Sequence, residues 1–227
     1  MKRSVSALLP SAFYLLPCCL LACLAIAAPA RAQQAESIGP FVVDIRGAFA
    51  RHKAEPSVAN DLGVAAGNLP SRSVGLVGGA HVYPLHSRKI TLGFGGNVVI
   101  ARGSLALDVL DRAGKVTGQG PTVRRHFTTF SPEVSLNFGH RNGWSYISGG
   151  MFGRSKLYVD LAATPATQAP YRRTLNYGGG ARWFTTDRIA FSVDFRWYSV
   201  AEQAAITGLV AQPRTTLLVL SGGIAIK

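Results

Sequence analysis

Charged residues are few in this chain of 227 residues, and acidic ones are the scarcest. Asp, Glu, Lys and Arg make up 15% of the residues, against roughly 25% in soluble globular domains. Only 11 residues are acidic, whereas 24 are Lys or Arg. The hydrophobic fraction of 48% excludes an intrinsically disordered chain, because disorder requires low hydrophobicity. A coiled coil is excluded as well, since it would be rich in Glu, Lys, Leu and Ala.

The first 32 residues have the organisation of a secretory signal peptide. Lys2 and Arg3 form a basic start, an apolar stretch follows over 7–28, and Ala-Arg-Ala at 30–32 is typical of a cleavage site. A transmembrane helix is the competing interpretation, but Pro10 and Pro17 interrupt the apolar stretch and Pro29 follows it. We therefore expect residues 1–32 to be removed during export through the periplasm.

Cysteine is absent beyond the signal peptide, since the three cysteines are Cys18, Cys19 and Cys23. A lipoprotein signal ending at Cys23 is a weaker alternative, because the apolar stretch continues past it. The processed chain therefore has no disulfide, no thiolate zinc site and no cysteine nucleophile.

Long hydrophobic runs are also absent after the signal peptide, and no segment has the 18 continuous apolar residues of a membrane-spanning helix. No long stretch carries an apolar face of helical period either. What recurs is alternation with period 2, rich in aromatic and β-branched residues, which predicts strands. The eight predicted strands cover 40–51, 72–83, 89–101, 126–138, 144–154, 174–184, 188–199 and 214–226.

The connections between these strands alternate in length. Long connections cover 52–71, 102–125, 155–173 and 200–213, and short ones cover 84–88, 139–143 and 185–187. Transmembrane barrels have short turns at one rim and long loops at the other. Strands of about ten residues, tilted near 40°, cover about 25 Å, which matches the apolar band of such barrels. In lipid the last strand must pair with the first, because every backbone polar group needs a partner.

Three stretches carry a resemblance to a known family: GAHVYPL at 79–85, FSPEVSLNFG at 130–139, and GGGARWFTTDRIAFSVDFRWYS at 178–199. They resemble the small eight-stranded outer-membrane β-barrel family, which includes the OmpA transmembrane domain and OmpX-type proteins. The resemblance implies an all-β fold, an eight-stranded antiparallel up-and-down transmembrane β-barrel over 40–227, after a short periplasmic segment at 33–39. It also implies a location in the cell outer membrane, contact with outer-membrane lipid, and the outer-membrane assembly machinery as a partner. Unlike many members, the chain does not end in an aromatic residue.

Seven charged or titratable strand residues fall on the face predicted to line the barrel. An eight-stranded barrel is just wide enough for side chains to fill, and buried ions need partners. A three-residue turn at 186–188 would place Gly180 opposite Asp194, with Arg182 diagonally within reach of Asp194. We expect a polar network that plugs the lumen, with a gated or narrow ion path as the alternative. Its members are Asp44, Arg46, His81, Glu133, Arg182, Asp194 and Arg196.

Four aromatic residues are candidates for the girdle at the water–lipid boundary: Trp144, Tyr146, Trp183 and Trp197. The facing of strand 144–154 is open at this stage. A two-residue turn at Asn142-Gly143 would pair Asn137 with Ser148 and turn Trp144 and Tyr146 inward, whereas a longer turn would turn them out.

Basic residues are frequent in the long connections. At the outer rim they would meet the phosphates of lipopolysaccharide, with which Arg and Lys pair well. Ordinary solvated loop charge is an equal alternative. The candidate contacts are Arg124, Arg125, Arg172 and Arg173.

These observations favour a structural or surface-interaction role for a membrane-embedded barrel with long basic loops. A narrow pore for small solutes or ions is the main alternative. A lipid-modifying enzyme, for which His86-Ser87 is the only faint signal, and a soluble lipocalin-like binder are further alternatives. No nucleophile elbow, zinc-protease motif or phosphate loop is present, so we expect no enzyme activity, cofactor or metal. The export signal argues against nucleic acid as a partner, and no pattern indicates an oligomeric state.

Overall fold

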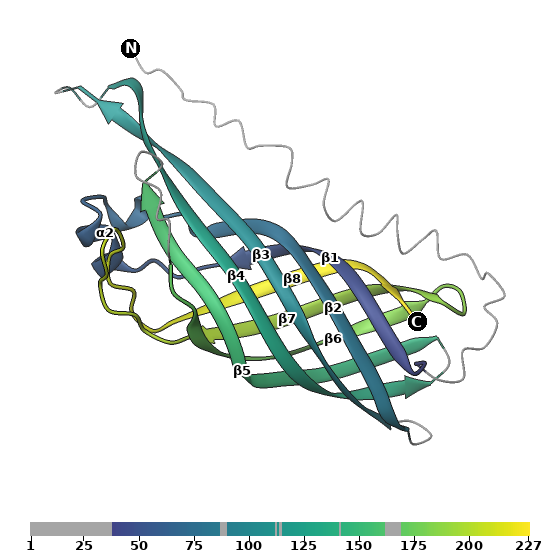
Figure 1. Cartoon of the computed structure of the whole chain (residues 1–227). Helices are drawn as coiled ribbons and strands as arrows, with labels where there is room; N and C mark the ends of the chain where they lie inside the picture. The colour runs from purple at the N-terminus through teal and green to yellow at the C-terminus, as the bar shows by residue number, and fades with distance from the viewer. Residues whose placement is uncertain (1–37, 87–89, 112, 114, 141, 162–168) are drawn as a thin grey trace, which may run out of the picture. The chain divides into compact units, whose positions relative to one another are not determined.

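A computed structural model of the chain describes residues 38–86, 90–111, 113, 115–140, 142–161 and 169–227 (Figure 1). The predicted signal peptide and most of the segment at 33–39 lie outside the described residues. The eight strands are β1 (Phe41–Arg51), β2 (Arg72–His86), β3 (Ile90–Leu110), β4 (Val116–His140), β5 (Gly143–Leu161), β6 (Arg172–Phe184), β7 (Ile189–Val200) and β8 (Thr215–Ile226).

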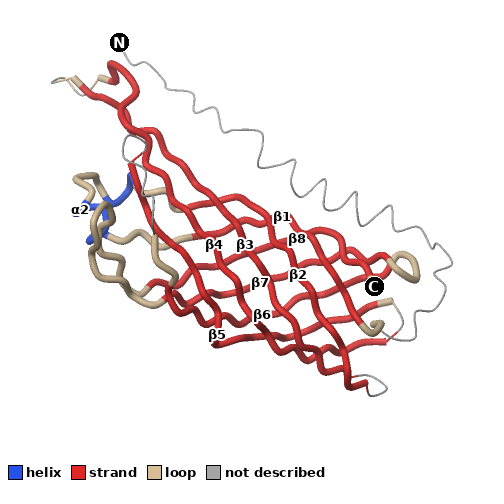
Figure 2. Tube along the Cα trace, viewed as in Figure 1, coloured by secondary structure: helices blue, strands red, loops and turns tan. Residues whose placement is uncertain are grey.

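The strands form one closed antiparallel ring in sequence order (Figure 2). Closure is made by β1 and β8, which pair from Val43 opposite Ile226 to Arg51 opposite Leu218. No edge strand is left along the shared part of the ring, so backbone polar groups there find partners without water.

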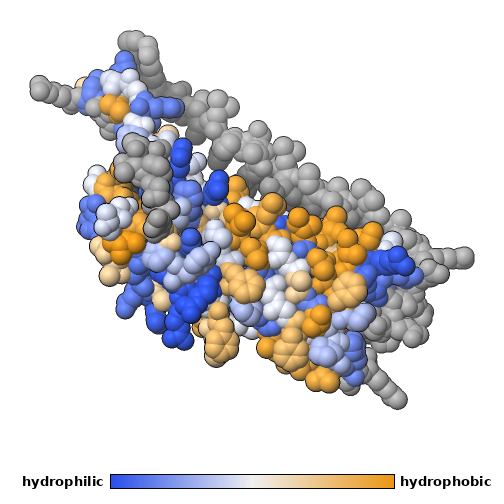
Figure 3. Space-filling view, in the orientation of Figure 1, coloured by the Kyte–Doolittle hydropathy of each residue, from blue (hydrophilic) through white to orange (hydrophobic). Residues whose placement is uncertain are grey.

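Side chains alternate between the outside and the inside of this ring, except where the pairing is interrupted, as at Met151 and Phe152 of β5, which are both exposed. In β1 every second residue is buried, and the residues between them, such as Phe41, Val43 and Ile45, are exposed. The exposed apolar residues of all eight strands form a band around the barrel, part of which is the orange zone in Figure 3. A surface so apolar, around an interior that contains charges, is arranged for lipid. The prediction of an eight-stranded antiparallel up-and-down transmembrane β-barrel is thereby confirmed.

Three strands continue further than the sequence pattern predicts. The connection predicted at 102–125 is wrong in most of its length, because β3 runs on to Leu110 and β4 begins at Val116. The tip is a turn in which the Asp111 carboxylate accepts hydrogen bonds from the backbone N–H groups of Ala113 and Lys115. Pairing above the rim needs only backbone hydrogen bonds, so the apolar alternation that marks a strand in lipid is missing there. The same reason applies to β5, which continues to Leu161.

The connection 52–71 contains the helices of the structure, α2 (Pro56–Asp61) and the 3₁₀ turn η1 (Ala66–Asn68). Among the described residues, no helix has the length and apolar character needed to cross a membrane.

The β4–β5 turn settles how β5 faces. His140 is opposite Gly143 and Asn137 is opposite Tyr146, so the predicted pairing of Asn137 with Ser148 is wrong by two residues. A two-residue slip keeps every side chain on its own face, because the side-chain period is two. Trp144 and Tyr146 accordingly point inward and are 3% and 5% exposed.

Candidate functional site: the filled lumen and the extracellular rim

Six charged side chains join in one chain of ion pairs across the middle of the lumen, and we name them the ionic layer. Basic and acidic members alternate, in the order Arg182, Asp44, Arg46, Asp194, Arg196 and Glu133. Three positive charges thus meet three negative ones, and the layer is neutral. The members come from β1, β4, β6 and β7, so the pairs bridge the lumen from wall to wall.

The geometry of the ionic layer is that of direct pairs. The Arg46 Nε lies 2.9 Å from the Asp44 Oδ1, and the Arg196 Nη2 lies 2.9 Å from the Asp194 Oδ2. The Arg182 Nη2 lies 3.2 Å from the Asp44 Oδ2. Every one of these side chains is at most 4% exposed, so the attraction acts in a medium of low dielectric constant.

Neutral side chains take up the remaining hydrogen-bonding capacity. The Tyr146 hydroxyl donates to the Asp194 Oδ2 at 2.8 Å, and the Arg182 guanidinium lies over the Tyr146 ring. Further N–H groups of the three arginines donate to polar atoms on other strands, in most cases not the adjacent one. The acceptors are Tyr83, Asn97, Asn176 and Ser148.

The structure brings all seven predicted lumen residues inside the barrel, but one pairing differs from the prediction. Gly180 is opposite Asp194, as the turn at 186–188 predicts. Arg182 nevertheless pairs with Asp44 from the far side of the lumen, and Arg46 and Arg196 are the partners of Asp194. A long inward side chain of a narrow barrel reaches across the lumen as easily as along the wall, which strand register alone cannot reveal.

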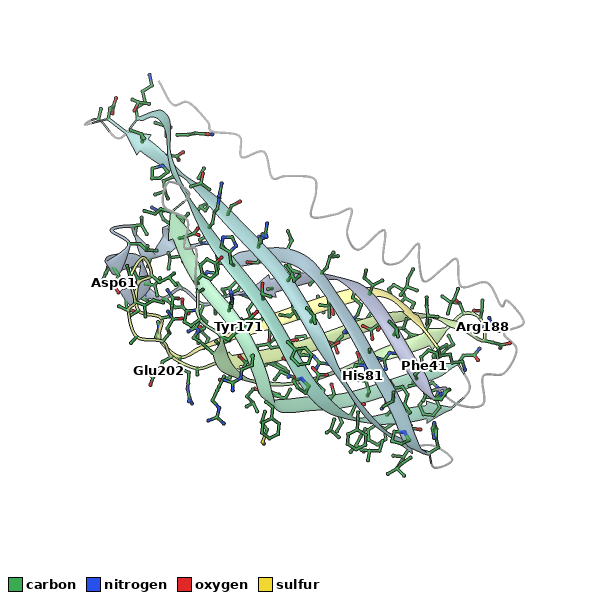
Figure 4. All side chains as sticks on the ribbon, viewed as in Figure 1. Phe41, Asp61, His81, Tyr171, Arg188 and Glu202 are labelled. Carbon is green, nitrogen blue, oxygen red and sulfur yellow. The ribbon has the colours of Figure 1, made fainter. Side chains whose placement is uncertain are left out.

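His81 joins the ionic layer at its end. Its Nε2 lies 3.8 Å from the Glu133 Oε2, and both side chains are at most 5% exposed. Figure 4 labels His81 among the side chains of the barrel. Within the described residues no group of three His, Cys, Asp or Glu side chains has a metal-binding arrangement.

Buried apolar side chains lie in the lumen on both sides of the ionic layer. The inner apolar layer, at the rim of the short turns, consists of Ile38, Val42, Tyr83, Trp144, Phe184, Ala190 and Ala225. The outer apolar layer consists of Ala48, Ala50, Val77, Val99, Ala101, Phe127, Leu157, Tyr198, Val200, Leu217 and Val219. A lipocalin-like pocket must be open and apolar. The lumen of this barrel instead contains charged side chains between two apolar layers.

The girdle prediction is wrong for two of its four residues. Trp144 belongs to the inner apolar layer and Tyr146 to the lumen, because the β4–β5 turn turns both side chains inward. Trp183 faces outward and is 49% exposed, with Phe191 stacked beside it. Trp197 also lies on the outward face, where its ring packs against Tyr177 and Phe195. A girdle role for Trp183 and Trp197 stays a prediction.

Two of the four predicted lipopolysaccharide contacts face outward, and the other two face inward. Arg124 and Arg173 are exposed on the outer face, whereas Arg125 and Arg172 are 1% and 5% exposed. Arg125 pairs with Glu55, and Arg172 donates to the backbone oxygens of Leu157 and Ala201. The prediction is therefore wrong for Arg125 and Arg172, because adjacent residues of a strand point to opposite faces.

The β1–β2 connection, residues 52–71, folds over the mouth of the barrel at the rim of the long connections, and we call it the cap. Val58, Ala59 and Leu69 of the cap pack against Val123 and Val159, which lie on the inner faces of β4 and β5 above the rim. Glu55 anchors the cap through its pair with the buried Arg125, 3.6 Å between Oε2 and Nη2. Sequence reasoning missed Glu55, since nothing local marks a loop carboxylate as the partner of a strand residue 70 positions away.

His52 lies buried at the first residue of the cap. Its Nε2 is 2.9 Å from the Ser73 Oγ. Burial, reinforced by the positive charge of Arg125, lowers the pKa of His52 from 6.5 to about 3. The imidazole is therefore neutral in the closed cap at neutral and mildly acidic pH.

Acid should open the cap. Between pH 6.5 and about 3 the released His52 binds a proton that the buried one does not, so closure weakens as the pH falls. The free energy that favours the closed cap falls by at most about 1.4 kcal/mol per pH unit. The protection factors of the α2 amides against hydrogen exchange, which correct for the slower intrinsic exchange in acid, should fall over this window in the wild type and much less in His52→Gln. An equal fall in both proteins would contradict the assignment to His52.

The fold defines an integral membrane β-barrel of the eight-stranded class, with buried charged and apolar side chains in its lumen. Neisserial surface protein A is similar in structure, at 11% identity and a TM-score of 0.49, over 83% of this chain and 97% of that one. The outer membrane protein OprG from Pseudomonas aeruginosa is similar at 13% identity and a TM-score of 0.47, over 86% and 98%.

Ail, the attachment invasion locus protein of Yersinia pestis, is similar at 12% identity and a TM-score of 0.46, over 82% of this chain and 97% of Ail. That structure contains the heparin analogue sucrose octasulfate. No protein-family model matches the chain, and no curated protein matches it. Likeness of this degree carries no argument about function, which must come from the residues of the chain itself.

Proposed function

We propose that the chain is a non-conducting outer-membrane barrel whose function lies at its extracellular face. In this proposal the barrel is a membrane anchor, and the cap, the β3–β4 hairpin and the outward-facing cations meet lipid and other macromolecules. The proposal assigns no reaction to the chain.

The observation that carries the proposal is the layering of the lumen. An ion on the barrel axis would have to pass the inner apolar layer, the ionic layer and the outer apolar layer in turn. Each apolar layer would strip water from it, and the neutral ionic layer would offer no free countercharge. The cap lies over the mouth beyond these layers.

A surface role is supported by what faces outward above the apolar band. Arg51, Arg72, Arg102, Arg124 and Arg173 are exposed on the outer face near the rim of the long connections. Lipopolysaccharide presents phosphates at this level of an outer membrane, and arginine binds phosphate with two parallel hydrogen bonds.

The test is conductance in planar lipid bilayers. The refolded processed chain should insert without discrete conductance steps at moderate voltage. Folding is checked separately by heat-dependent migration in detergent gels. Reproducible single-channel steps from the folded wild type would overturn the proposal and favour the narrow-pore alternative. Recovery of the processed chain as a water-soluble monomer without detergent would overturn the membrane location.

A further inference from the structure

Two arginines lie directly opposite each other on the lipid-facing side of the barrel. Arg154 of β5 is the register partner of Arg173 of β6, and both are exposed. Directly opposed residues of an antiparallel pair have Cβ atoms about 5 Å apart, and like charges there are destabilising. Lys156, two residues further along β5, adds a third charge, with its Nζ 4.5 Å from the centre of the Tyr171 ring.

Acidic side chains do not neutralise this cluster in the part of the chain that the structure describes. None of the ion pairs found there involves Arg154, Lys156 or Arg173. The neighbouring carboxylate of β5, Asp160, lies 3.7 Å from the His126 Nε2. Three cations of one face are therefore left to attract an anion from outside the protein.

An apolar groove of about 710 Å³ lies in the barrel wall on the same strands. It is lined on its outward side by Phe94, Val134, Met151, Phe152, Leu175 and Tyr177. A second groove of about 550 Å³ shares Val134, Gly149 and Tyr177 with it and continues toward Trp197. Together the two grooves make an apolar channel along β4, β5 and β6 that is open to the lipid.

The groove exists because the sheet pairing is interrupted there. Regular pairing of β4 with β5 stops between Phe130 and Val134, and that of β5 with β6 stops between Gly150 and Gly153. Pro132 has no backbone N–H to donate at this place. Gly150 lies under the Pro132 carbonyl, where a Cβ would overlap the oxygen.

The groove and the cations are in register. Phe152 precedes Arg154 by two residues on β5, and Leu175 follows Arg173 by two residues on β6. Both apolar residues therefore lie on the side of the cluster toward the short turns. Two strand residues span about 7 Å. A molecule with a phosphate at its polar end and acyl chains below it matches this arrangement.

Resting on the outer-membrane orientation of the proposed function, we propose that Arg154, Arg173 and Lys156 bind a phosphate of a lipid A-type glycolipid. One acyl chain of that lipid lies in the groove at Phe152 and Leu175. The site is one defined position on the outer face of β4, β5 and β6, and the other rim cations are not part of it. Neither groove includes a residue of β1 or β2, although Arg51 and Arg72 form a like-charged pair there as well.

The experiment measures binding of purified bisphosphorylated lipid A to the refolded barrel by native mass spectrometry from detergent. The variant R154Q/R173Q should bind at least tenfold more weakly, while the matched control R51Q/R72Q should stay within about twofold of the wild type. Heat-dependent gel migration confirms that each variant is folded. Equal loss in both double variants would overturn the site and leave the proposed surface role intact, because diffuse rim charge would then explain binding.

A second measurement separates the groove from the cations. Dephosphorylated lipid A and the acyl-free sugar phosphate should each bind at least tenfold more weakly than intact lipid A. If the acyl-free sugar phosphate binds as well as lipid A, the groove has no occupant and the proposal is wrong. Leu175→Trp, which fills the groove without touching a charge, should weaken lipid A binding and leave binding of the sugar phosphate unchanged. Conductance by the folded wild type would contradict the proposed function without affecting either result.

Discussion

Asp194→Ala is expected to lower the free energy of unfolding by about 3–5 kcal/mol, which is the cost of removing one partner of a buried ion pair. Asp194 forms ion pairs with Arg196 and Arg46 and accepts a hydrogen bond from the Tyr146 hydroxyl. Its removal leaves the ionic layer with an excess positive charge far from water. The measurement is urea unfolding in detergent micelles, together with the temperature at which the folded band disappears from gels.

Ser192→Ala is the matched control for Asp194→Ala. Ser192 lies two residues before Asp194 on the same strand and the same inward face, and its Oγ has no hydrogen-bond partner among the described residues. Its replacement should change stability by less than about 0.5 kcal/mol. If the two variants unfold at the same urea concentration, Asp194 does not hold the ionic layer together.

Gly223→Val is expected to destabilise the barrel by about 3 kcal/mol, at the upper end of overpacking costs. Gly223 is opposite Arg46 in the seam where β8 closes onto β1. A Cβ at this position would overlap the Ile45 carbonyl oxygen and lie 2.6 Å from the Arg46 Cα. Because backbone atoms cannot move aside without opening the seam, the folded fraction after refolding should fall as well.

The neighbouring glycine supplies the comparison. Gly222 faces outward, and a Cβ there would meet nothing nearer than the Ser192 oxygen at 3.7 Å. Gly222→Val should therefore refold like the wild type and expose only one more apolar side chain to lipid. A comparable loss of folded protein in both variants would mean that general strand propensity, rather than the closing seam, sets the requirement for glycine.

Strand parity explains how much of the interior could be predicted from the sequence. Asp44 and Arg46 lie two residues apart, so they share a face, and the apolar residues between and around them show which face meets lipid. The same parity places Arg124 and Arg173 on the outer face and Arg125 and Arg172 on the inner face. Because all four were predicted to lie in loops, the alternation was not applied to them. Asn97 and Asn176, which accept from Arg46 and Arg196, also lie on polar faces that the alternation reveals.

The unpredicted features depend on contacts between distant segments. Arg182 meets Asp44 across the lumen, and Glu55 meets Arg125 only because the cap folds into the mouth. The extension of β3 and β4 lacks the lipid-facing alternation that marks the other strands. Pro132 marks the interruption of the sheet in the sequence. The resulting groove could not be predicted, because its shape depends on the positions of three strands.

The β3–β4 hairpin carries part of the surface away from the mouth of the barrel. Residues 103–110 of β3 continue beyond the last pairing with β2, at Arg102, over a length of up to about 26 Å. Figure 1 shows the end of the hairpin well away from α2 of the cap. A molecule bound at the end of the hairpin would therefore leave the cap uncovered, so two partners could bind these features separately.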